Sequence, residues 1–190
     1  MTPQDILDFW YEDMTPEEWF SVSETRDAEI TRRFGALWET AASGGLTRWL
    51  ASPRATLAYV IVTDQFPRNM HRGSPRSFET DPKARAAAKS ALLRRLDARL
   101  SQSERYFLYM PLMHSETLPD QDRCVRLMQL RVPDNAPALL HARAHREVIR
   151  RFGRFPFRNE ALGRVTTDAE RAFMEAGAYG AVVREMDAAA

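Results

Sequence analysis

The chain has 190 residues, of which 44% are hydrophobic and 28% are charged, as in an ordinary soluble globular protein with one full-sized core. Its formal net charge of +1 argues against a general nucleic-acid-binding protein, and its single Cys124 excludes an internal disulfide and a multi-cysteine zinc site. The N-terminal sequence lacks the pattern of a signal peptide, and the longest apolar run, Leu57 to Val62, is too short to cross a membrane. We therefore predict one cytoplasmic domain, residues 1–190, with neither a nucleic acid nor a membrane as partner.

Four helices are predicted in the first part of the chain. They run from Pro3 to Tyr11, from near Ser23 to Gly44, from Pro53 to near Gln65, and from Asp81 to about Leu100. The third is expected to end before Phe66, because a residue that precedes a proline is pushed out of the helical region.

Four more helices are predicted in the second part. The first follows the capping box of Ser101 and Glu104, and the others run from Pro119 to about Val132, from Pro137 to Phe152, and from Thr167 to Gly177. No segment alternates as a strand would. About eight helices joined by short turns predict an all-α fold of antiparallel helix pairs, which is a tetratricopeptide-repeat-like bundle or short superhelix. The consensus spacing of that repeat is absent, so the repeat itself is not established.

Charge is distributed unevenly along the chain. Residues 1–40 hold ten acidic and three basic residues, whereas residues 81–164 hold nine acidic and seventeen basic residues. The simpler interpretation is that the acidic first part packs on the basic later part, and the alternative is that the basic part meets an anionic partner.

Two similar motifs follow long apolar segments: DQFPRN, from Asp64 to Asn69, and GRFPFRN, from Gly153 to Asn159. Arg and Asn side chains supply several hydrogen-bond donors in little space, which suits a carboxylate or a phosphate. We expect the two loops to meet across the core and to grip one anion. The alternative is that these side chains cap the last carbonyls of the preceding helices. The ligand-binding residues predicted on this basis are Arg68, Asn69, Arg72, Arg154, Arg158 and Asn159, together with His145.

Asp64 lies on an apolar helical face, together with Leu57, Val60 and Ile61. This places a carboxylate at the C-terminal end of its helix, where the helix dipole disfavours a negative charge. A buried carboxylate needs a cationic or hydrogen-bonding partner. Asp64 is therefore predicted either to form a structural Asp–Arg pair or to line a site as a catalytic residue.

Three histidines carry the other chemical signals. His114, on an apolar helical face, is predicted to act as an acid or base with Glu116 or Asp64, although a lone histidine there is often a hydrogen-bonded core residue. His141 and His145 have the i, i+4 spacing of two metal ligands, but no third ligand is fixed by the sequence. We therefore predict neither a metal nor a cofactor.

The motifs together resemble the bacterial family called domain of unknown function 924. The resemblance rests on DQFPRN with Arg72, Phe78 and Asp81, on MPLMHSE, on His145 through FGRFPFRNEALGR, and on Trp10 and Trp19-Phe20. It covers nearly the whole chain. It implies an all-α fold similar to tetratricopeptide-repeat proteins, and it implies no established activity. Family members often have His at the position of Phe157, so a metal or proton relay that used this His would be missing here.

Three hypotheses about function follow. The first is a pocket for a small anionic metabolite, with proton transfer by His114 as an extension. The second is a helical scaffold that binds a peptide or protein without catalysis, an inference from fold analogy. The third is that the motifs only fix loops to the core. The sequence leaves open whether the protein is an enzyme.

Overall fold

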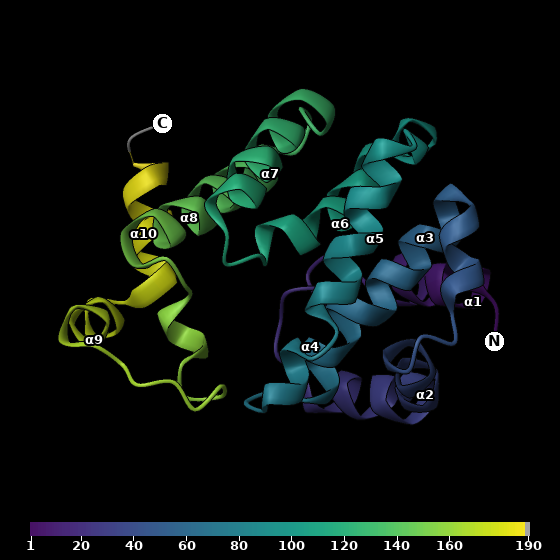
Figure 1. Cartoon of the computed structure of the whole chain (residues 1–190), viewed down its shortest axis with the longest axis horizontal. Helices are drawn as coiled ribbons and strands as arrows, with labels where there is room; N and C mark the ends of the chain where they lie inside the picture. Colours follow the sequence, from purple (N-terminus) through teal and green to yellow (C-terminus); the bar gives the residue numbers. More distant parts are fainter. Residues whose placement is uncertain (189–190) are drawn as a thin grey trace. The chain divides into compact units, whose positions relative to one another are not determined.

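The computed structural model describes residues 1–188, and within this range it consists of α-helices and short 3-10 and π-helical segments, with no β-strand (Figure 1). The predicted all-α fold is confirmed, while its likeness to tetratricopeptide repeats stays a prediction. The chain forms two compact units, Met1–Pro111 and a second unit that begins at Leu112. The single domain predicted over residues 1–190 therefore stays a prediction. In the described part, every helix is too short or too polar to cross a bilayer.

The first unit is built on helices that begin where the capping residues predict. Its α-helices are α1 (Pro3–Asp8), α2 (Glu24–Ala42), α3 (Pro53–Val60), α4 (Phe66–Met70), α5 (Asp81–Leu93) and the greater part of α6 (Gln102–Met113). The 3-10 helices are Thr47–Ala51, Pro75–Phe78 and Leu96–Arg99, and the π-helical segments are Phe9–Asp13 and Ile61–Gln65. Helix α1 packs on α3, α2 on α4, and α3 on α5.

The prediction that Phe66 leaves the helix is wrong. Phe66 has α-helical dihedral angles, and its N–H donates to the carbonyl of Ile61, five residues back, as in a π-helix. Its ring is fully buried and lies 4.7 Å from the ring of Phe34, centroid to centroid. The π-helical segment thus absorbs Pro67, and the buried ring outweighs the local preference of a residue before proline.

The carbonyl that Pro67 leaves without a donor is satisfied from another helix. Pro67 has no N–H to offer to the carbonyl of Thr63, four residues earlier. The Thr80 hydroxyl donates to this oxygen at 2.6 Å and accepts from Nε1 of Trp38 at 3.1 Å. One buried hydroxyl therefore connects α2, the π-helical segment and the start of α5.

Helix α5 is shorter than predicted. It ends at Leu93 and not near Leu100, because Arg95 adopts a left-handed conformation with φ of 55°. The following turn places Asp97 in the core, where the Tyr109 hydroxyl donates to its carboxylate at 2.7 Å. The sequence pattern alone would continue the helix, but this hydrogen bond between distant side chains favours the turn.

The second unit contains four α-helices that carry its core. They are α7 (Leu118–Arg131), α8 (Ala136–Phe152), α9 (Asp168–Glu175) and α10 (Ala178–Asp187), and a 3-10 turn covers Pro156–Arg158. Helix α8 packs on both α7 and α10 (Figure 1). Gly153, with φ of 69°, ends α8 as predicted.

The prediction that the helix from Thr167 is the last one is wrong. Gly177 ends α9 but also begins α10, with φ of 101°. The signal for α10 is an apolar stripe with i, i+3, i+4, i+7 spacing, made by Tyr179, Val182, Val183 and Met186, which packs on the core of the second unit.

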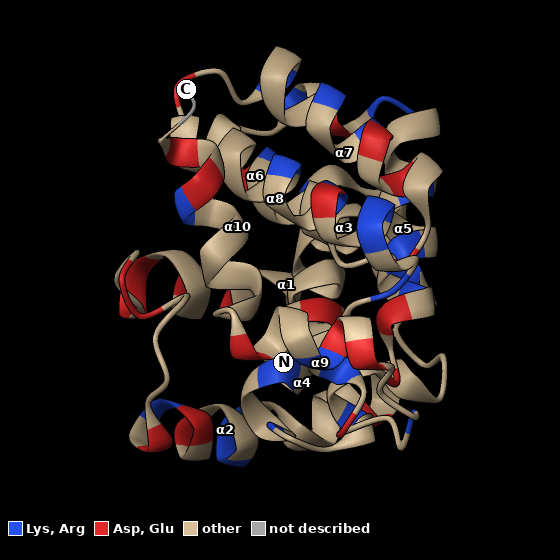
Figure 2. Ribbon diagram, turned by 90° about the vertical axis from the view of Figure 1, so that its left-hand side faces the viewer, with Lys and Arg blue, Asp and Glu red and all other residues tan. Residues whose placement is uncertain are grey.

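Five of the ten acidic residues in the first 40 positions form ion pairs within the first unit. Acidic and basic bands lie side by side on α2 (Figure 2). The ion pairs are Arg26 with Glu18 and Glu29, Arg33 with Asp13 and Glu29, Arg72 with Asp27, and Arg76 with Glu39. These arginines lie at residues 26–76 and not in the basic segment 81–164, so the interpretation that the acidic first part packs on the basic later part stays a prediction.

Replacing Thr80 by Val should lower the free energy of unfolding by about 1–3 kcal/mol for each polar group that it strands, here Nε1 of Trp38 and the carbonyl of Thr63. Val keeps the shape of Thr and removes the hydroxyl. Urea denaturation would measure the loss. Thr80→Ser keeps the hydroxyl and is the matched control. A Thr80→Val variant as stable as Thr80→Ser would contradict the role of this hydroxyl.

Candidate functional site

The first motif places Asp64 and Arg68 in one buried network. Asp64 is fully buried, and its Oδ2 accepts from Nε2 of Gln65 at 2.5 Å. Arg68 Nη1 lies 3.5 Å from Oδ1 of Asp64, and the guanidinium binds both oxygens of Asp81 at 2.9 and 3.0 Å. The sequence thus correctly indicated an arginine partner for Asp64. This arrangement fits the structural Asp–Arg pair better than a proton-transfer group.

Asn69 and Arg72 share a different carboxylate. The Asn69 side-chain amide donates to Oδ1 of Asp27 at 2.8 Å, and Arg72 donates to both Asp27 oxygens at 2.7 and 3.0 Å. Asp27 belongs to α2, so these bonds fix α4 on α2. The side chain of Asn69 is therefore used between helices and not as a cap for its own helix.

The second motif repeats this arrangement with Glu170. Arg154 donates to both carboxylate oxygens of Glu170 at 2.6 and 2.8 Å, and the Asn159 amide lies 3.3 Å from Oε2. Hydrogen bonds from Arg154, and then from the Thr167 N–H, hold the pKa of Glu170 at about 2. In both motifs, an Asn and a neighbouring Arg therefore bind the same carboxylate. The expectation that the two motifs grip one anion stays a prediction.

Glu116 is bound on both oxygens. Arg164 donates to them at 2.7 and 3.0 Å, and the backbone N–H of Phe155 donates to Oε1 at 2.8 Å. Burial raises the pKa of Glu116, but the bonds from Arg164 and Phe155 outweigh it, so the pKa lies below its ordinary value. A carboxylate held ionised in this way suits a structural role better than the predicted exchange of protons with His114.

Three of the four histidines gather in the second unit. The ring of His145, on α8, lies 6.1 Å from that of His114 and 4.5 Å from that of Tyr179, centroid to centroid. The ring of Phe155 stands edge-on to His145 at 5.5 Å. His141, one turn earlier on α8, places Nδ1 2.6 Å from the Tyr179 hydroxyl. We call His114, His141, His145 and Tyr179 the histidine cluster.

His145 is held as one neutral tautomer. Its Nδ1 lies 2.8 Å from the carbonyl of His141, which can only accept, so Nδ1 carries the proton. Burial, and then the neighbouring His114, lower the pKa of His145 to about 3. At neutral pH, Nε2 therefore presents a lone pair, and no group among residues 1–188 forms a hydrogen bond with it.

Arg158 brings a positive charge to the histidine cluster. Its side chain is 7% exposed, Nη2 donates to the carbonyl of His114 at 3.1 Å, and the guanidinium lies 4.6 Å over the ring of Phe155. Phe157 stacks on Phe155 at 5.2 Å and is 37% exposed, so it adds apolar surface beside Phe155.

The predicted site residues thus separate into three groups. His114, His145 and Arg158 come together, whereas Arg154 and Asn159 are bound to Glu170, and Asp64, Arg68, Asn69 and Arg72 belong to the first unit. Tyr179 was missed because α10 was missed. The paired acids Asp27 and Glu170 were missed because they lie 42 and 11 residues from their Asn partners.

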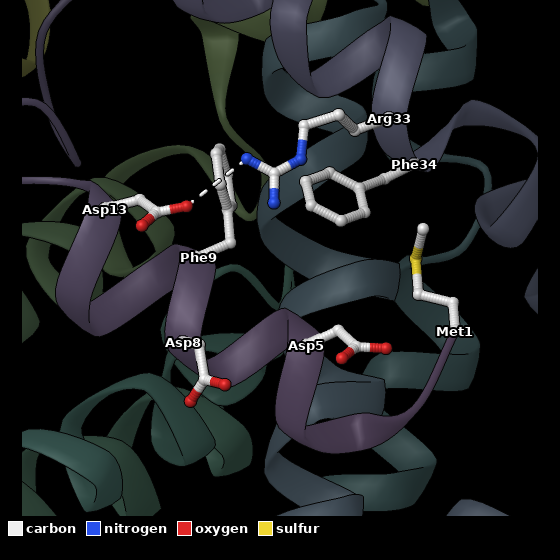
Figure 3. A pocket seen from close by; sticks show the side chains of 7 residues that line it. All are labelled: Met1, Asp5, Asp8, Phe9, Asp13, Arg33 and Phe34. Atoms are coloured by element: carbon white, nitrogen blue, oxygen red, sulfur yellow. Dashed lines mark hydrogen bonds and ion pairs between the residues drawn. The ribbon is translucent and has the colours of Figure 1, made fainter.

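Other polar sites were also considered. In residues 1–188, no group of three or more His, Cys, Asp or Glu side chains is arranged to hold a metal ion. A pocket of about 450 Å³ in the first unit is lined by three aspartates and by Arg33, whose guanidinium lies between the rings of Phe9 and Phe34 and pairs with Asp13 at 3.3 Å (Figure 3). None of the predicted site residues lines this pocket.

Replacing Arg154 by Ala should destabilise the second unit and raise the pKa of Glu170 from about 2 toward its ordinary value of 4.5, because the strongest bonds to this carboxylate are lost. NMR titration of the Glu170 side chain and urea denaturation would measure both effects. Arg171→Ala is the control, since its pair with Asp168 is exposed. Equal stability of the two variants would refute the structural role of Arg154.

His145 should make the protein acid-sensitive. Its folded pKa of about 3 lies below its ordinary 6.5, so the unfolded chain binds more protons, and stability falls as the pH drops below about 6.5. On acidification, the His145→Gln variant should lose less stability than the wild-type protein, by up to about 1.4 kcal/mol per pH unit. Solvent screening of the partly exposed ring makes this difference smaller. Urea denaturation between about pH 7 and pH 4 tests it. Parallel stability curves for the two proteins would contradict a neutral His145.

Comparisons with known proteins agree with the resemblance noted in the sequence. The model of the family described as "Bacterial protein of unknown function (DUF924)" matches residues 6–178. A solved structure of a protein of unknown function from Agrobacterium tumefaciens is 39% identical, with a TM-score of 0.85, over 91% of this chain and 96% of that chain. No curated protein matches the chain. The chain therefore belongs to the bacterial DUF924 family.

Proposed function

We propose that this protein binds a small anionic molecule, a carboxylate or a phosphate ester, at the histidine cluster and Arg158. The observation that carries the proposal is the fixed tautomer of His145, which holds an unpaired Nε2 beside a guanidinium and a second imidazole. Structural histidines usually pair both ring nitrogens or lie among apolar groups. A neutral imidazole aimed by a backbone carbonyl is typical of a ligand-binding site.

The charge at the cluster favours an anion. After burial and the neighbouring His114, the positive charge of Arg158 also contributes to the low pKa of His145. The same charge would attract a negative group and disfavour a metal cation. A weakly acidic group of the ligand could donate a hydrogen bond to Nε2 of His145 while its charge faces Arg158.

The surrounding structure supports a fixed geometry at this place. Phe155 forms one wall, and it is held by Glu116, through its backbone N–H, and by Arg164, which donates to its carbonyl at 3.0 Å. Tyr179 holds His141 from α10. Groups supported in this way keep their positions when a ligand arrives, which lowers the cost of binding.

Proton transfer is an extension of the proposal. His114 would be the group that takes up or releases a proton, and His145, whose pKa is lowered to about 3, would accept a hydrogen bond. Glu116 would position the loop and not react. Asp64 is not included, because its carboxylate is bound by Gln65 and Arg68 in the first unit.

A thermal-shift screen of carboxylates and phosphate esters tests the proposal. A ligand at 100 times its dissociation constant should stabilise the protein by about 2.7 kcal/mol. Arg158→Gln and His145→Gln should each abolish the shift while the protein stays folded. Arg150→Gln is the control, since Arg150 is exposed and pairs with Glu147 on its own helix.

A bound anion should also raise the pKa of His145, because it offsets the positive potential there. NMR titration of the ring nitrogens, with and without the ligand, measures this change. Ligands that stabilise both variants as strongly as the wild-type protein would refute the assignment of the site.

A further inference from the structure

A groove of about 760 Å³ lies between the first turns of α8 and the end of α10, away from the histidine cluster. Its floor is apolar and is made by Pro137, Leu139 and Leu140 of α8 and by Met186 of α10. Each of these side chains is partly or fully exposed. Arg143 and Arg146 line the groove as well, with Asp187 at the end of α10.

One of the two arginines that line this groove, Arg143, is not neutralised by a neighbour. Arg143 is exposed and has no ion pair or hydrogen bond to any side chain in the described range. Arg146 makes a long ion pair, 3.5 Å, with Asp122 of α7. This surface therefore carries the positive charge of an exposed guanidinium beside an apolar stripe of partly exposed leucines.

A further arginine extends this positive charge onto α7. Helices α7 and α8 are joined by four residues, so they run antiparallel. Asp122 of α7 lies opposite Arg146 of α8. Arg126 follows Asp122 by one helical turn, and Arg143 precedes Arg146 by nearly one turn. Because the helices are antiparallel, Arg126 and Arg143 therefore lie on the same face. Arg126 is exposed and, within the described residues, is also without an ion pair.

We propose that this groove binds an amphipathic helix of a partner protein that carries acidic residues along one flank of its apolar stripe. The open form of the groove favours a helix over a fatty acid, since an acyl chain would stay half in water, whereas an amphipathic helix turns a polar face outward. A second copy is a poorer partner, because the lining of the groove would offer its two arginines only one acidic residue, Asp187. The unpaired arginines select the acidic flank.

The test uses a synthetic helical peptide with leucines at i, i+3, i+4 and i+7 and glutamates beside them. We expect it to bind and to shift the backbone NMR signals of residues 136–146 and 186–187. A matched peptide with lysines in place of the glutamates should not bind. Arg143→Glu should weaken binding roughly tenfold, and more in low salt than in high salt. Arg32→Glu, the same change on exposed α2, should leave affinity unchanged.

Several results would overturn this proposal. One is equal binding of both peptides, and another is an Arg143→Glu variant that binds as the wild-type protein does. Laurate that fills the groove more tightly than the peptide would assign it to an acyl ligand. Self-association in sedimentation velocity that is lost in Leu140→Glu would assign it to a second copy. His145→Gln should leave peptide binding unchanged, so this test is independent of the proposed anion site.

Discussion

Bidentate pairing between arginines and buried or half-buried carboxylates is the interaction on which the second unit depends most. The segment from Gly153 to Thr167 contains one 3-10 turn, and the rest of it consists of other turns and irregular backbone. Arg154 with Glu170, and Arg164 with Glu116, fix its two ends. The loop can therefore place an aromatic wall beside α8 without regular secondary structure, because charge-assisted bonds replace the missing helical ones.

The first unit uses the same kind of bond for a different purpose. There the arginines join helices that are already regular: Arg72 fixes α4 on α2, and Arg68 connects α4 to the first turn of α5 through Asp81. The two similar motifs thus share a means of attachment. The anion site that we propose uses Arg158 of the second motif, which follows Phe157, the residue that the first motif lacks.

Features with a local cause could be predicted from the sequence. Ser23 begins α2 and Gly153 ends α8 because a cap depends on residues within one turn. Features with a distant cause could not. Phe66 stays helical because of a ring packed from α2, and Asp27 meets Asn69 across 42 residues. The sequence indicated that arginine partners exist for buried acids, but the choice of partner is a tertiary property that spacing along the chain does not encode.

The π-helical segment Ile61–Gln65 has an evolutionary consequence. A π-helical turn holds more residues than an α-helical turn, so this segment has no residue to spare inside a buried helix. Deleting one residue there would turn everything after it by about 100°, which would carry Phe66 out of the aromatic core and Arg68 away from Asp81. A change in the length of this segment would therefore remove the first motif from its place, whereas a change in the length of an exposed loop need not.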